Sequence, residues 1–274
     1  MLTSILVPFD DSSYSWSAAR HAIQMARPFR ATIHGLYTID VRITKGQLVR
    51  DLKVDSKTAQ DAYEDKGETL LEKLGSECKS ASVAFRSILT TGAIFQSIRR
   101  ATSQVDAELI AMGKKGVNAR WSGALLGSVA ESVVRQAKRP VLLAQEEYIP
   151  IETVYVAYDG KLVSIRALRF AAELCARCKW KMNVISIHRS EERRKKLLRE
   201  AAEMAEIHRV KITKTGRGGD ATKQILDITS EDPSALIVLG AYSRRLRGLI
   251  LGGVAEQVIH KSPQPVLLYR PFSS

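Results

Sequence analysis

The sequence predicts an α/β protein built from two tandem doubly wound domains, each with a mostly parallel five-stranded sheet. Two observations support this prediction: short apolar strand patterns alternate with helical patterns, and the same series occurs twice along the chain. Strands that alternate with helices form parallel sheets covered on both faces. The wholly apolar strand expected at Leu236–Leu239 agrees with burial on both sides.

The first elements follow in order from their residue patterns. Ser4–Phe9 is a short apolar run with β-branched residues, which is typical of a strand. Ser15–Arg27 places apolar residues at helical spacing, and Ser12 or Ser13 is available as its N-cap. The next apolar run, Thr32–Thr38, predicts the second strand.

The alternation continues to the end of the first half. Lys57–Ser80 is expected as a helix because its many charges fall on one face. The remaining elements are expected, in turn, as strand Ala84–Leu89, helix Ile94–Gln104, strand Leu109–Met112, helix Gly127–Gln136 and strand Val141–Gln145. The second half repeats this order, with a shorter segment after its second strand.

An internal repeat sets the domain organisation. The 17 residues that start at Gly127 align without a gap on the 17 that start at Gly252, and 9 of them are identical. The two halves also begin alike, since the strand before Asp10 parallels the strand before Asp159. We therefore expect domains at residues 1–148 and 149–274. The junction holds Pro150 and no long Gly/Ser tract, which favours close packing over a loose tether.

The terminal strands of the two halves predict how the halves meet. Val141–Ala144 and Val266–Tyr269 are both apolar, and an exposed apolar strand edge invites pairing. We expect the two copies to form an intramolecular pseudo-dimer. A homodimer of whole chains stays open.

Composition indicates a globular protein. Hydrophobic residues make up 45% of the chain and charged residues 26%, which argues against disorder. No apolar run approaches the roughly 20 residues of a membrane helix, so no membrane is expected as a partner. The N-terminal residues lack the basic and apolar regions of a signal peptide. Three cysteines cannot form a disulfide framework, so we expect the cytoplasm.

The net charge is +13 and is divided unevenly. Residues 1–150 carry a balance of +4 and residues 151–274 a balance of +9. A basic surface attracts phosphate groups, whether in nucleotides, nucleic acids or lipid head groups. Charge alone does not choose among these ligands.

A glycine-rich segment carries the chemistry of the first half. It runs from Gly113 through Gly116 to Gly127 and Ser128, between a strand and a helix. Glycines let backbone N–H groups approach an anion, and a helix N-terminus favours negative charge. Lys114 and Lys115 add positive charge, and Asp10 ends the first strand. Ligands of open α/β sheets bind at these strand ends.

These residues resemble the universal stress protein family in its tandem-domain form, over nearly the whole chain. The family signature is a strand-end Gly, two residues, Gly, about nine residues, then Gly-Ser or Gly-Thr. It is similar to Gly113, Gly116, Gly127 and Ser128, although ten residues separate Gly116 from Gly127 here. The opening Ile-Leu-Val-Pro-Phe-Asp-Asp-Ser-Ser also resembles the family's first strand and loop. The resemblance implies Rossmann-like domains and ATP binding.

The resemblance also implies roles for individual residues. Asp10 is expected at the adenosine end, Thr38 near the adenine, and the glycine segment around the phosphates. The implied binding residues are Pro8, Asp10, Thr38, Met112, Gly113, Lys115, Gly116, Gly127, Ser128 and Val129. AMP or ADP is an alternative to ATP, and Mg²⁺ is compatible with bound ATP.

The second half departs from the signature. Ser243 stands in place of the second glycine, Gly253 replaces the hydroxyl residue, and only eight residues separate Ser243 from Gly252. Asp159 remains, and Arg244, Arg245 and Arg247 could bind phosphate through their side chains. Both a weaker nucleotide site and a degenerate copy kept for packing stay open.

Other motifs give weaker signals. Cys175 and Cys178 lie within the expected helix Leu162–Cys178, and no second pair completes a zinc site, so we expect no metal ligands. The run Glu191–Arg199 reads as a solvated helix start, because its acids precede its bases. A surface for nucleic acid or an acidic partner is the alternative reading of this run. No aromatic residues interleave these bases, so nucleic acid is not expected.

Together these features predict an ATP-binding stress-response or regulatory protein that acts as a nucleotide-responsive binding module. No nucleophile constellation and no general base opposite a phosphate are recognised, so a dedicated enzyme is not expected, although slow ATP hydrolysis is compatible with the residues. One alternative is a nucleotide-free scaffold whose basic second half binds a protein partner of unknown identity. Another is an adenylate-using transferase of a related fold. Such enzymes usually carry a Ser-Gly-Gly signature, which this sequence lacks.

Overall fold

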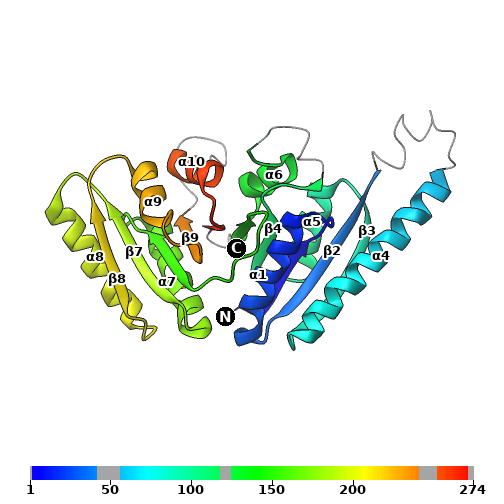
Figure 1. Cartoon of the computed structure of the whole chain (residues 1–274), viewed down its shortest axis with the longest axis horizontal. Helices are drawn as coiled ribbons and strands as arrows, with labels where there is room; N and C mark the ends of the chain where they lie inside the picture. The colour runs from blue at the N-terminus through cyan, green and yellow to red at the C-terminus, as the bar shows by residue number, and fades with distance from the viewer. Residues whose placement is uncertain (1, 42–55, 118–124, 241–251, 271–274) are drawn as a thin grey trace.

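The computed structural model describes residues 2–41, 56–117, 125–240 and 252–270. All described strands join one ten-stranded sheet in the order β3-β2-β1-β4-β5-β10-β9-β6-β7-β8 (Figure 1). The strands of the first half are β1 (Ser4–Pro8), β2 (Thr32–Asp40), β3 (Ala84–Gly92), β4 (Leu109–Gly113) and β5 (Val141–Ala144). Those of the second are β6 (Thr153–Ala157), β7 (Lys181–Ile187), β8 (Ile212–Arg217), β9 (Ala235–Gly240) and β10 (Val266–Tyr269).

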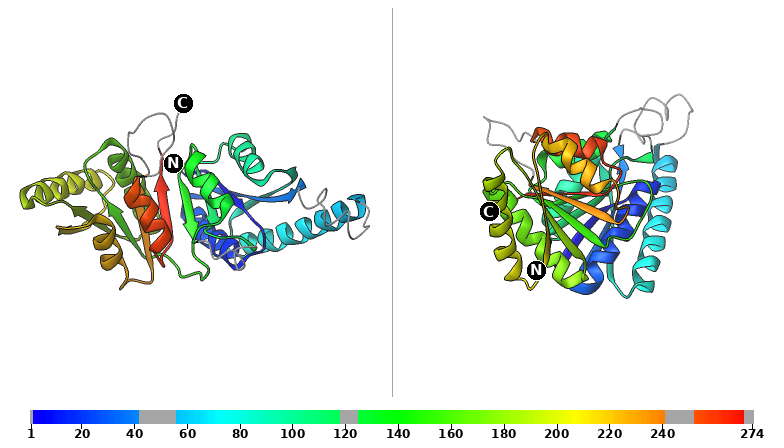
Figure 2. Two further views of the ribbon diagram at one scale, coloured as in Figure 1. Left: turned by 90° about the horizontal axis from the view of Figure 1, so that it is seen from above. Right: turned by 60° about the vertical axis from the view of Figure 1, so that its left-hand side comes forward.

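Helices cover both faces of each half (Figure 2). One apolar core lies under α1 (Ser13–Phe29), α4 (Ser56–Ser80), α7 (Leu162–Cys178) and α8 (Glu191–Glu206). The other lies under α5 (Ile94–Gln104), α6 (Ser128–Gln136), α9 (Ala221–Thr229) and α10 (Gly253–Lys261). The strand pairs within each half are parallel, so the predicted α/β fold class is confirmed.

The two halves meet at one antiparallel strand pair. β5 pairs with β10 so that Leu142 lies opposite Leu267, and both side chains are fully buried. The expected pairing of the two terminal strands is therefore confirmed. It turns two five-stranded sheets into one continuous sheet and covers the edge that each half would otherwise expose.

The residue after each of these strands reaches across to the other half. The side-chain amide of Gln145, after β5, donates to the carbonyls of Ser262 and Gln264, just beyond α10. The buried Arg270, after β10, donates to the carbonyls of Val134, Arg135 and Ala137 at the end of α6. A guanidinium at a helix C-terminus satisfies carbonyls that have no partner within the helix and complements the helix dipole.

The junction between the halves is packed against α1. The Gln24 side chain forms two hydrogen bonds with the backbone of Ile151, at 2.8 and 3.0 Å, and the Tyr148 ring lies 4.8 Å from that of His21. These contacts agree with a close connection between the two copies. The boundary between residues 148 and 149 stays a prediction.

Local sequence patterns predicted most helix ends well but fewer strand ends. Ser12 is the N-cap of α1 and accepts a hydrogen bond from the Ser15 backbone. α7 spans the predicted Leu162–Cys178. β2 and β3 extend together to Asp40 and Gly92, beyond the predicted ends. This extension contains polar residues such as Thr90, which join the ladder through backbone bonds that side-chain patterns do not reveal.

No helix in the described ranges combines the length and the apolar character that a membrane-spanning segment requires.

We predict that residues 1–148, expressed alone, self-associate. Removing the second half exposes the edge of the apolar strand β5, and a second copy can cover that edge by two-fold pairing. Sedimentation velocity over a range of concentrations measures the association, with the intact chain as the control. A fragment that stays monomeric at high concentration would show that β5 does not need a partner.

Candidate functional site

The strand order reverses direction between β1 and β4, which makes this a topological switch point of the sheet. The chain leaves β1 through α1 toward β2 on one side, whereas β4 and β5 lie on the other side. Such a switch point leaves room at the carboxyl ends of the two strands, where ligands of open α/β sheets bind. Pro8 ends β1 and Gly113 ends β4. The sequence-predicted site residues of these two strands therefore converge.

Gly113 is required by helix packing. A Cβ atom at this position would lie 2.6 Å from the Cβ of Tyr14 and 2.9 Å from the Tyr14 carbonyl carbon, at the start of α1. At Gly240, its equivalent in the second half, a Cβ atom would lie 3.2 Å from the backbone nitrogen of Ser164 in α7. In both halves the strand-end glycine thus lets a helix pack closely against the sheet. This requirement for glycine does not depend on a bound ligand.

Asp10 holds the glycine segment in place. One carboxylate oxygen accepts hydrogen bonds from the Ser12 backbone and hydroxyl, at 3.1 and 2.6 Å. The other oxygen accepts from the backbone N–H of Val117 at 3.1 Å. A Cβ at Gly116 would lie 2.6 Å from this second oxygen. Gly116 therefore lets the carboxylate tie the end of β1 to the segment that follows β4.

Gly127 is the N-cap of α6 and donates its backbone N–H to the Lys114 carbonyl at 3.0 Å. Its φ is −69°, which any residue adopts, and a Cβ there would have no neighbour nearer than 3.4 Å. The fold therefore has room for a small side chain at this position. A glycine N-cap has no side chain to bond the first-turn N–H groups, so these groups suit an outside anion.

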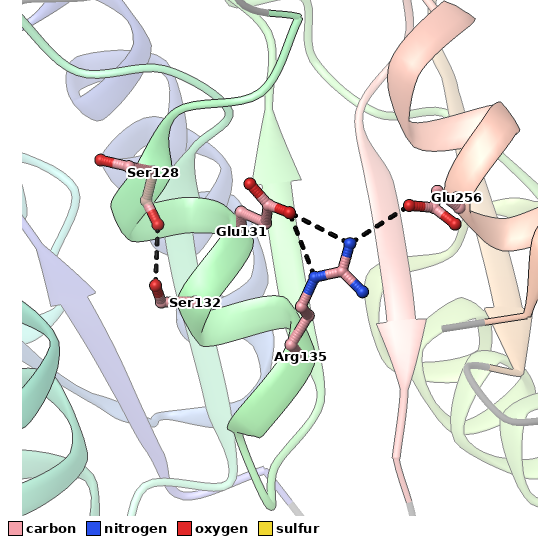
Figure 3. Close-up of polar contacts among 5 residues, drawn as sticks. All are labelled: Ser128, Glu131, Ser132, Arg135 and Glu256. Atoms are coloured by element: carbon pink, nitrogen blue, oxygen red, sulfur yellow. Dashed lines mark hydrogen bonds and ion pairs between the residues drawn. The ribbon is translucent and has the colours of Figure 1, made fainter. Parts of the chain in front are cut away.

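A network of charges links the first and last turns of α6 to α10 (Figure 3). Arg135 donates to Glu131 of the same helix at 3.0 and 3.1 Å, and to Glu256 of α10 at 3.2 Å. This guanidinium offsets part of the negative charge that Glu131 places near the helix start. The Ser132 hydroxyl donates to the Ser128 carbonyl, and the Ser128 side chain lies exposed at the helix start.

The two lysines of the segment point to different places. Lys115 is half-buried beside Gly116. Lys114 is almost completely buried, and its ammonium donates to the carbonyls of His260 and Ser262, at the end of α10. The expectation that Lys114 adds its charge to the loop is wrong, because its side chain instead links the loop to the second half.

The other predicted residues line the same edge in different ways. Thr38 lies near the end of β2, and its hydroxyl is enclosed without a hydrogen-bond partner among the described residues. Met112, near the end of β4, has its side chain buried in the core under α6. Pro8 and Val129 are half-buried. The structure thus brings together the ends of β1, β2 and β4 and the start of α6.

Two contacts here escaped the sequence analysis. Ser12 and the Val117 backbone are the partners that fix Asp10. An Asp followed two residues later by Ser is a turn signal that indicates the first contact. Nothing local in the sequence indicates the second, which joins residues 107 positions apart.

The equivalent carboxylate in the second half has a different partner. Asp159 accepts the Lys161 ammonium at 2.6 Å and the Ser164 hydroxyl at 2.7 Å. Burial opposes ionisation, but these hydrogen bonds outweigh it and hold the pKa of Asp159 below its ordinary value. Gly252 is the N-cap of α10, and Gly253 is exposed with open space around it. Ser243, Arg244, Arg245 and Arg247 lie outside the described residues.

Across the described ranges, no group of three or more His, Cys, Asp or Glu side chains is placed to hold a metal ion. Cys78, Cys175 and Cys178 are free thiols, and burial raises the pKa of each to about 12. Such thiols are poor nucleophiles and poor metal ligands at neutral pH. The Cys175–Cys178 pair reads as ordinary helix packing.

Comparisons with known proteins agree with this architecture. The model of the universal stress protein family matches residues 1–145 and 181–270. A universal stress protein of Synechocystis sp. is 22% identical over 289 residues, which cover 98% of this chain and 100% of its own. One from Methanocaldococcus jannaschii is 29% identical over 142 residues, or 52% of this chain and 81% of its own.

A solved structure shares the fold of both halves. The crystal structure of a universal stress protein from Archaeoglobus fulgidus superposes with a TM-score of 0.80 at 23% identity. The match covers 97% of this chain and 98% of that one. The tandem arrangement predicted from the internal repeat is therefore found in a known structure.

We predict that Gly113→Ala destabilises the protein and that Gly127→Ala does not. The first methyl group would collide with the backbone of α1, and overpacking of this kind costs about 1–3 kcal/mol. The second has room, and the change should alter the free energy of unfolding by less than about 1 kcal/mol. Urea unfolding of both variants measures the difference. Equal losses would show that Gly113 is not confined by α1.

We predict that Lys114 makes stability depend on alkaline pH. Burial, together with the Lys115 charge, lowers the pKa of Lys114 from 10.5 to about 8. Between these values the unfolded chain holds a proton that the folded chain releases, so stability rises with pH. Between about pH 8 and pH 10.5 the free energy of unfolding of the wild type should rise. Relative to Lys114→Met, the rise should be on the order of 3 kcal/mol.

The control for this prediction is Lys196→Met, which removes an exposed lysine from α8 and so matches the change in net charge. Urea unfolding of the wild type, Lys114→Met and Lys196→Met at several pH values gives the free energy of unfolding of each as a function of pH. If Lys114→Met and Lys196→Met show the same dependence on pH, the buried ammonium is not its source.

Proposed function

The chain belongs to the universal stress protein family, and from this premise we propose that it is a nucleotide-responsive binding protein. In this proposal ATP occupies the glycine segment of the first half. AMP and ADP are the smaller ligands that the same site would accept, with fewer phosphate contacts.

The observation that carries the proposal is the glycine N-cap of α6. Gly127 has an ordinary φ and space for a small side chain, so the fold does not demand glycine there. Ser, Asp or Asn would cap the helix better. Glycine instead leaves the first-turn N–H groups to an outside acceptor, and it stands beside Gly116 at the switch point of the sheet. A phosphate group is the ligand that fits this combination.

Each residue of the site then has a role. The backbone N–H groups of Ser128 and Val129 bind phosphate, with the Ser128 hydroxyl as a further donor. Lys115 contributes positive charge from its half-buried position. We place Thr38, near the end of β2, beside the nucleoside; its hydroxyl is enclosed and has no hydrogen-bond partner among the described residues. Asp10 acts mainly by positioning the loop, because both of its oxygens already accept hydrogen bonds.

The second half would hold nucleotide more weakly. It keeps a glycine N-cap at Gly252 but has Gly253 where the first half has Ser128. Its Asp159 is paired with Lys161, which gives that strand end a different charge arrangement. We expect one tightly bound nucleotide per chain.

Binding is proposed in place of catalysis because the described site residues include no base or nucleophile set against a phosphate. We propose the cytoplasm as the compartment, since three free, largely buried thiols suit a reducing environment. A second candidate function is a scaffold that works without nucleotide. It is favoured by the +9 balance of residues 151–274.

We predict that Gly127→Val weakens ATP binding and that the matched change Gly252→Val in the second half does not. The branched side chain at position 127 would press on the Lys114–Gly116 backbone and move the N–H groups that receive phosphate. Ser128→Gly should lower affinity about tenfold to a hundredfold, the value of one hydrogen bond to a charged group.

Isothermal titration calorimetry of the full-length chain with ATP, in the presence and absence of Mg²⁺, measures these affinities. Far-ultraviolet circular dichroism checks that each variant is folded. Two equivalent sites per chain, or one site unaffected by either change in the first half, would show that the halves are wrongly assigned. No binding of ATP, ADP or AMP by the wild type would favour the scaffold.

A further inference from the structure

A groove of about 1440 Å³ lies over α1, on the face covered by α1, α4, α7 and α8. Helix α1 supplies its middle, α4 lines one side, and the junction and the C-terminal end of α7 line the other. Its lining residues lie on the helix face, and the described strand ends of the nucleotide site are not among them. The groove is therefore a separate feature from the proposed site.

The long dimension of the groove follows one face of α1. Trp16, Arg20, Ile23 and Arg27 recur at intervals of four, three and four residues, so their side chains form one stripe. At 1.5 Å per helical residue this stripe is about 16 Å long. An extended peptide of about five residues has the same length.

The charges in the groove are mostly positive. Its cations are Arg20, Arg27, Lys73, Arg177 and Lys179, and its carboxylates are Glu72 and Glu77. Glu77 is already paired with Arg20 at 3.2 Å. Within the described part of the chain, Arg27, Lys73 and Lys179 have no ion pair. The groove therefore presents an excess of positive charge that an acidic ligand would complement.

Aromatic surface lies between these cations. Trp16 packs edge-on against Phe9 at 4.7 Å and is half-exposed, and Arg20 lies 5.9 Å from its ring. Tyr148, half-buried against His21, and the largely buried Trp180 line the side formed by the junction and α7. Rigid aromatic side chains of this kind, with arginines beside them, are the usual anchors of protein interfaces.

From this combination we propose that the groove binds an acidic peptide segment of a protein partner, about five residues long and extended, with one or two apolar side chains. The carboxylates of the peptide pair with Arg27, Lys73 and Lys179. Its apolar side chains rest on Trp16, Ile23 and Trp180. An acidic peptide is preferred to a lipid surface because the cations line a concave groove between helices, whereas a membrane contacts a flat or convex face.

The test begins with an array of random peptides probed with the labelled full-length protein. We expect the bound peptides to be enriched in Asp and Glu together with Leu, Ile or Phe. The strongest peptide is then titrated in solution by tryptophan fluorescence, because two of the three tryptophans line the groove. Binding should weaken as salt is raised, since surface charge pairs are screened.

Two charge-reversal variants locate the binding. The groove variant carries Arg27→Glu, Lys73→Glu and Lys179→Glu, and the control carries Lys196→Glu, Arg199→Glu and Lys211→Glu on exposed positions of the second half. Both change the net charge equally. We expect the groove variant to lose at least about tenfold in affinity, as removal of several charge pairs does, and the control to stay near the wild type.

Several outcomes would overturn the proposal. These are an array without acidic enrichment, equal losses in both variants, or groove-dependent binding to phosphatidylserine vesicles in place of peptide. Circular dichroism and thermal unfolding check that the variants fold. If the groove variant is unfolded, the milder pair Arg27→Gln and Lys179→Gln replaces it, and unchanged peptide affinity in that pair would also overturn the proposal.

Discussion

The antiparallel pair of β5 and β10 is the contact on which the rest of the structure depends. Each half alone would expose an apolar strand edge, and the pairing removes both edges at once. Gln145 and Arg270, directly after these strands, then hold the ends of α10 and α6. The C-terminal end of α6 is thereby held by a side chain from the opposite half, whereas the proposed phosphate site lies at the other end of the same helix.

The glycines of the first half differ in how strictly the fold requires them. Gly113 is needed because α1 packs on it, and Gly240 shows the same constraint in the second half. Gly116 gives access to the carboxylate of Asp10, and Gly127 occupies a cap position where the fold has room for a side chain. Glycine spacing alone therefore mixes two signals. Only the geometry separates the glycine that a helix requires from those that a ligand would use.

Much of the fold could be predicted from the sequence because its signals are local or repeated. Apolar runs located the strands, Ser12 was one of two candidate N-caps for α1, and the repeat indicated that the terminal strands would be equivalent. The site was predictable only in part. The direction of Lys114 depends on α10, 146 residues later, and the contact of Asp10 with Val117 depends on how β1 and β4 adjoin. No pattern within one segment carries such information.

The two copies share the contacts that hold the fold but differ in local chemistry at the strand ends and helix starts. Gly113 and Gly240, the strand pair and the reciprocal caps keep both halves in register. Ser128 and Gly253 occupy equivalent exposed positions, and Gly253 has open space around it. The carboxylate that ties down the loop in the first half binds a lysine in the second. Among the described residues, these differences between the halves lie at strand ends and helix starts, where a side chain can change without disturbing the buried core.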